Sequence, residues 1–123
     1  MPKEISVEVA DTPFKREFGL QYAKDLPEMS GMLFRFDRSN VLNFWMKNTY
    51  LPLDIAFVND EGMVVKTEKM VPLSLRTVSS GVPCNMALEV PSGTLEKANC
   101  GVGSRIKVNW ESKRVSFDDP HRV

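Results

Sequence analysis

The stretch from Asn43 to Val58 constrains the fold of this chain more than any other part of the sequence, because two strand-like runs flank a short polar turn. The runs cover residues 42–46 and 53–58, and both are rich in the branched and aromatic residues that strands favour. Between them, Asn48 and Thr49 suit a turn, because both side chains can bond to nearby backbone groups. The stretch has the size of a hairpin and indicates a β-rich fold.

Alternation within the two runs assigns their side chains to opposite faces of a sheet. In the first run, Trp45 and Lys47 share one face with Asn43, and the other face is apolar. In the second run, Asp54 lies opposite the apolar face. The apolar residues that we expect to pack together in the core are Leu42, Phe44, Met46, Leu53, Ile55 and Phe57.

Asp54 is a carboxylate among apolar neighbours, and such a group needs a partner when it is buried. In the favoured interpretation, it accepts hydrogen bonds from the turn at Asn48 and Thr49 and stabilises that turn. In the alternative interpretation, it contributes to a ligand pocket. That pocket would be lined by Trp45, Lys47, Asp54 and Glu89.

Strand patterns also dominate the rest of the chain. Residues 71–83 interrupt them with prolines, a glycine and several hydroxyl side chains, and this composition predicts a long loop of the kind that often lines binding sites. From residue 111 onward the chain is mostly polar, which predicts a loosely held tail at 111–123. Alternating apolar residues predict five further strands, at 4–9, 31–36, 63–70, 86–90 and 105–110.

Two short helices complete the prediction. Thr12 followed by Pro13 indicates a helix start, and Phe14 and Phe18, one turn apart, would dock this helix on the sheet. A second helix is expected within 92–99. The predicted fold is therefore α+β and mainly antiparallel β: a compact, β-barrel-like or strongly curved sheet with two short helices, in a single domain over residues 1–110.

Composition narrows the classes of protein and of partner. A chain of 123 residues forms one domain with its own core. Sixteen basic and sixteen acidic side chains cancel, which argues against nucleic-acid binding, because phosphates call for a basic excess. The N-terminus has no apolar signal-peptide region, and no apolar run could span a bilayer. We expect a cytoplasmic, soluble monomer without membrane contact.

The two cysteines, Cys84 and Cys100, are expected to be free thiols, because a cytosolic domain of this kind usually keeps them reduced. The single histidine, His121, lies in the polar tail, and no Cys-x-x-Cys spacing is present. The sequence therefore predicts neither a metal site nor a Cys–His nucleophilic pair, and no cofactor is expected.

Four motifs carry a resemblance to a known family: Gly31-Met32-Leu33-Phe34, Phe44-Trp45-Met46-Lys47-Asn48-Thr49, Pro52-Leu53-Asp54-Ile55 and Leu88-Glu89-Val90. With these motifs, residues 5–110 resemble the family known as domain of unknown function 192. The resemblance implies a compact β-rich fold and no established reaction. Many members of that family carry a secretion signal, which this chain lacks. The chain also departs from the family at residues 71–83, where members often have a loop rich in proline and cysteine.

Three classes of function remain open at this point. The first is a binding module, in which Trp45 stacks on a small polar or aromatic ligand and Lys47 or Arg76 pairs with an anion. The second is a hydrolase with Asp54 or Glu89 as general base. The third is a structural or partner-binding domain. The candidate binding residues are Trp45, Lys47, Asn48, Thr49, Asp54, Arg76 and Glu89.

Overall fold

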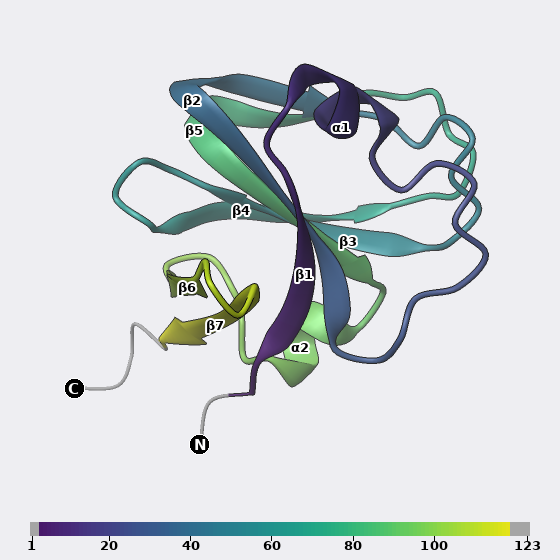
Figure 1. The fold of residues 1–123 in the computed structure, drawn as a ribbon. Coiled ribbons are helices and arrows are strands. Elements are labelled where there is room, and N and C mark those ends of the chain that lie inside the picture. Colours follow the sequence, from purple (N-terminus) through teal and green to yellow (C-terminus); the bar gives the residue numbers. More distant parts are fainter. Residues whose placement is uncertain (1–2, 119–123) are drawn as a thin grey trace.

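The computed structural model describes residues 3–118, which form seven strands in one curled sheet and two short helices (Figure 1). The strand order is β4-β3-β5-β2-β1-β7-β6; β1 and β2 are parallel, and all the other strand pairs are antiparallel. The sheet curls into a half-barrel, which confirms the predicted fold class. The elements are β1 (Ile5–Ala10), α1 (Pro13–Phe18), β2 (Ser30–Phe44), β3 (Leu53–Val58), β4 (Val64–Met70), β5 (Val78–Pro91), α2 (Thr94–Lys97), β6 (Arg105–Asn109) and β7 (Arg114–Asp118).

The two helices lie at opposite ends of the sheet, with α1 at the top of Figure 1 and α2 at the bottom. Helix α1 begins where the sequence predicted: the Thr12 hydroxyl group accepts a hydrogen bond from the Lys15 amide at 3.2 Å, and Pro13 occupies the first turn. Within the described residues, no helix is long and apolar enough to cross a membrane.

Strands β2 and β5 are much longer than the sequence predicted, and together they form a bent ribbon. Their pairing shifts register between Arg35 and Asn40, and such irregularities bend strands. The rings of Phe34 and Phe44 lie 4.9 Å apart although ten residues of straight strand would separate them by about 33 Å. Strand β2 therefore curls back over the sheet.

The loop predicted at 71–83 is shorter than expected, because β5 already begins at Val78. Its first residues pair with the far end of β2, where the ribbon leaves the sheet and exposes both polar and apolar side chains. A strand in such a ribbon does not need alternating apolar residues. The glycine, serines and proline at the start of β5 therefore resembled a loop in composition, although they form a strand. The Asn43–Val58 stretch is likewise not a hairpin: β5 lies between β2 and β3, which do not pair.

Both faces of the central strands are covered, and the two faces differ. The face that carries α1 and the bend of β2, here called the pocket face, includes Met32, Phe34, Leu42, Met46, Leu53, Ile55, Phe57 and Ala87. This cluster confirms the packing expected for both runs of the Asn43–Val58 stretch. The opposite face, here called the α2 face, includes Leu33, Ala56, Val58, Leu88, Val90 and Leu95.

One glycine permits the close approach of β2 to β5. A Cβ atom on Gly31 would lie 2.3 Å from the carbonyl oxygen of Glu89 and 2.7 Å from a methyl group of Val90. No side chain fits in that space, so the residue at position 31 is glycine for steric reasons.

The C-terminal segment differs from the expected tail. Residues 114–118 form β7, which pairs with both β1 and β6 and buries Val115 and Phe117. The polar residues between these two had suggested a tail, but they are the solvent side of a half-buried strand. His121 lies outside the described residues. Both cysteines are free thiols, as predicted, with Cys84 buried in the core.

Candidate functional site

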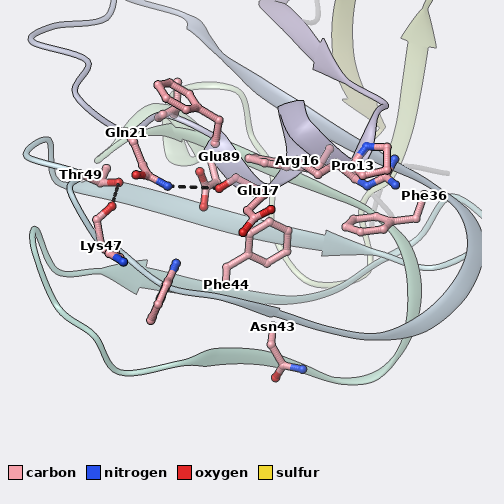
Figure 2. Close-up of a pocket in the computed structure, with 15 residues that line it drawn as sticks. Pro13, Arg16, Glu17, Gln21, Phe36, Asn43, Phe44, Lys47, Thr49 and Glu89 are labelled. Atoms are coloured by element: carbon pink, nitrogen blue, oxygen red, sulfur yellow. Dashed lines mark hydrogen bonds between the residues drawn. The ribbon is translucent and has the colours of Figure 1, made fainter.

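A pocket with a volume of about 460 Å³ lies on the pocket face, between α1 with its following turn and the curved part of β2. Figure 2 shows its side chains converging from elements that are far apart in the sequence. Residues 13–21 form one wall, and β2 with the segment that follows it forms the other. One residue of β5, Glu89, reaches the pocket from the sheet.

Helix α1 is held against β2 by Arg16 rather than by an apolar face. The Arg16 guanidinium group donates a hydrogen bond to the Arg35 carbonyl oxygen at 3.0 Å and lies 4.8 Å from the centre of the Phe36 ring. The expected docking by Phe14 and Phe18 is wrong. Their rings stack on each other 5.9 Å apart and stay exposed, beside a hollow that they share with Val9, Ala10 and Met32.

The turn at 46–49 fixes the other wall of the pocket. The Thr49 amide donates to the Met46 carbonyl oxygen, and the Thr49 hydroxyl group donates to the Lys47 carbonyl oxygen at 3.1 Å. Asn48 adopts a positive φ of 55° and donates a side-chain hydrogen bond to Gln21 at 3.1 Å. The predicted turn is confirmed, and it also binds the segment after α1.

Glu89 is the one strongly perturbed carboxyl group among the described residues of this pocket. It pairs in register with Met32 on β2 and Ile55 on β3, so its side chain lies on the pocket face between apolar neighbours. Only 4% of the residue is exposed, and burial alone raises the pKa of its carboxyl group to about 8. At neutral pH the group is mostly protonated.

Trp45 and Lys47 lie at the open edge of the pocket, on the face that the alternation predicted. Trp45 is 48% exposed, and the Lys47 ammonium group lies 5.4 Å from the centre of its ring. Figure 2 places Lys47 beside Thr49, with Phe44 and Phe36 along the β2 wall. Trp45 is therefore not a covered core residue.

Asp54 does not belong to this pocket. It pairs in register with Val90, so its side chain lies on the α2 face, away from Glu89. One carboxylate oxygen accepts a hydrogen bond from the Gly93 amide at 2.9 Å, and the other is buried without a hydrogen bond from the described residues. The expected bonds to Asn48 and Thr49 are not formed, because those residues lie beyond the opposite face of the sheet.

The remaining candidates divide between the pocket and other surfaces. Asn48 lines a smaller adjoining hollow that shares Trp45 and Lys47 with the pocket. Arg76 does not line the pocket, because its guanidinium group binds Glu68 at 2.9 Å on an exposed edge. The structure thus brings together Trp45, Lys47, Thr49 and Glu89, with Asn48 beside them.

Sequence reasoning missed the wall that α1 contributes, which includes Arg16, Glu17 and Gln21. The available signal was the composition of the helix itself. Three of its six residues, Lys15, Arg16 and Glu17, are charged, which leaves little apolar surface for docking, and in the structure none of its side chains is buried. The contacts that place it, however, join residues 19 to 27 positions apart in the chain.

Solved structures share this fold. A protein from Sinorhizobium meliloti 1021, described as a "putative transcription regulator", is 33% identical, with a TM-score of 0.77 over 85% of this chain and 92% of that chain. A protein of unknown function from Novosphingobium aromaticivorans DSM 12444 is 27% identical, with a TM-score of 0.80 over 84% of this chain and 74% of that chain. No curated protein matches this chain.

The family comparison covers nearly the whole described fold. Residues 1–108 match DUF192, described as "Uncharacterized ACR, COG1430", and the match includes every motif quoted above as well as both walls of the pocket. The chain therefore belongs to the domain of unknown function 192 family.

Proposed function

We propose that this protein is a small binding module whose ligand lies in the pocket between α1 and β2. One observation carries the proposal: Glu89 is 4% exposed, reaches the pocket, and has a carboxyl group that no partner among the described residues stabilises. Buried polar groups are normally paired, and exceptions call for a functional explanation. The pocket volume is within the range of about 300–1,000 Å³ that is usual for small-molecule sites.

The other side chains of the pocket indicate what such a ligand contains. Phe36, Phe44 and Trp45 offer aromatic surface to an aromatic or other apolar body. Lys47 lies at the open edge and would pair with an anionic group of the ligand. Arg76, the other expected cation, is held elsewhere by Glu68 and has no part in the proposal.

Fluorescence tests this proposal, because a Trp110→Phe variant retains Trp45 as its only tryptophan. In that variant, 3-phenylpropionate should change the emission saturably. Adding Lys47→Ala should weaken binding about fivefold, as expected for loss of an exposed ion pair, and the matched control Arg76→Ala should leave it unchanged. Equal losses in the two variants would contradict the role given to Lys47, and a failure of 3-phenylpropionate, 2-phenylethylamine and 2-phenylethanol all to bind would contradict the proposal.

A second candidate follows from the Glu89 pKa of about 8, which suits proton transfer near neutral pH. In this alternative, the protein is a hydrolase with Glu89 as its acid or base, and Glu17 is the second carboxyl group of the pocket. Turnover of p-nitrophenyl esters or phosphates by the parent, lost in Glu89→Gln and retained in Asp54→Asn, would support it. No turnover of these substrates by the parent would count against it.

A further inference from the structure

The deep part of the pocket has a chemical preference that differs from that of its open edge. Glu89 is flanked on the neighbouring strands by Met32 and Ile55, which are apolar. Toward the pocket, Phe34 and Phe44 lie edge to face with their ring centres 4.9 Å apart. The Glu89 carboxyl group therefore meets apolar and aromatic side chains, and the uncharged polar residues that line the pocket are Gln21, Asn43 and Thr49.

The two cations that line the pocket are both held away from Glu89. Arg16 is bound to the Arg35 carbonyl oxygen and to the Phe36 ring, and Lys47 lies over Trp45. Burial alone accounts for the raised pKa of Glu89, so neither cation lowers it. Within residues 3–118, the Glu89 carboxyl group has no counter-charge.

We infer that the deep end of the pocket receives a protonated amine of the ligand, which pairs with the Glu89 carboxylate. This inference rests on the proposed function and adds the class of ligand: a small ammonium compound with an aromatic or apolar body, and with any anionic group directed to Lys47. A cation gains both a charged hydrogen bond to Glu89 and the electron-rich faces of nearby rings. A neutral group gains only a hydrogen bond, and an anion is repelled by a carboxylate.

Proton release makes the inference measurable. In the empty pocket at pH 7 Glu89 holds a proton, since its pKa is about 8, and an ammonium ligand displaces that proton to the buffer. Affinity should therefore rise up to about tenfold per pH unit below the pKa and level off above it. Among the described residues, the other charged groups that line the pocket are Arg16, Glu17 and Lys47, and Met32 and Ile55, which pair with Glu89 on the neighbouring strands, are uncharged.

The experiment is a calorimetric titration of the Trp110→Phe protein with three probes of similar size: 2-phenylethylamine, 2-phenylethanol and 3-phenylpropionate. The amine should bind more tightly than the alcohol, and its affinity should increase from pH 6 to pH 8, where an alkylammonium group stays charged as lysine does. Glu89→Gln should remove this pH dependence. Glu17→Gln is the matched control, because it removes the other carboxylate of the pocket, and it should leave the pH dependence intact.

Each other outcome refutes a specific part of the account. If the alcohol or the propionate binds and the amine is no tighter than the alcohol, the inference is wrong and the proposed binding function stands. If Glu17→Gln rather than Glu89→Gln removes the pH dependence, the ammonium site is wrongly assigned. If none of the three probes binds, both the inference and the proposed function fail.

Discussion

Two carboxyl groups, Glu89 on β5 and Asp54 on β3, lie one register position apart in the same sheet but meet opposite environments. Asp54 lies on the α2 face, where the Gly93 amide donates a hydrogen bond to it. Glu89 lies on the pocket face between apolar side chains, without such a partner among the described residues. Strand register therefore places one carboxyl group where a backbone amide donates to it, and the other at a pocket without a donor among the described residues.

The largest expected effect tests the Glu89 side of this contrast. Folding raises its pKa from 4.5 to about 8, so between these values the folded state keeps a proton that the unfolded state releases. The free energy of unfolding therefore falls as pH rises through this window and is highest below it. Replacing Glu89 by glutamine removes that penalty and should stabilise the protein at pH 7 by on the order of 3 kcal/mol.

Urea denaturation of the parent and of Glu89→Gln, at pH 7 and at about pH 4.5, measures this effect. The gain should nearly disappear at the lower pH, where the folded parent stays protonated and the unfolded parent is already about half protonated. A glutamine variant that is less stable than the parent at pH 7 would show that Glu89 has a stabilising partner.

The next effect in size tests the Asp54 side. Asp54→Ala leaves the part-buried Gly93 amide without its acceptor and should destabilise the fold by on the order of 1–3 kcal/mol. Asp54→Asn retains an acceptor oxygen and should lose less. Thermal melts measure both variants, and a melt of Asp54→Ala identical to that of the parent would remove the structural role from this residue.

The smallest effect is expected at Arg76, which the sequence placed among the binding residues. Its ion pair with Glu68 is on an exposed edge, and such pairs contribute little. Arg76→Ala should change the free energy of unfolding by less than about 0.5 kcal/mol in urea denaturation. If the free energy of unfolding falls by well over about 1 kcal/mol, Arg76 stabilises the fold through contacts other than its ion pair with Glu68.

The predictable parts of the molecule depended on local patterns. Alternation alone separated the exposed Trp45 and Lys47 from the core residues of the same run, and Thr12 with Pro13 marked the start of α1. Resemblance to the family added the overall fold. The alternation and the helix start can each be recognised within a few neighbouring residues, and the family resemblance can be recognised from short motifs.

The parts that escaped prediction depend on contacts between distant residues. The partner of Asp54 is the Gly93 amide, 39 positions away, and no local pattern indicates it. Glu89 is buried because it lies on a central strand that is covered on both faces. Alternation along β5 tells which residues share a face, but it does not tell whether that face is covered. The wall formed by α1 depends on Arg16 reaching a carbonyl oxygen of β2.

Glu89 is a buried carboxyl group that faces a pocket and has no partner within residues 3–118. An NMR titration of the side-chain carboxyl carbons in ¹³C-glutamate-labelled protein tests it directly, with Glu89→Gln identifying the signal by its disappearance. This carboxyl group should titrate with a pKa of about 8. A pKa near the ordinary value of 4.5 would show that Glu89 is solvated or paired, and would contradict the account.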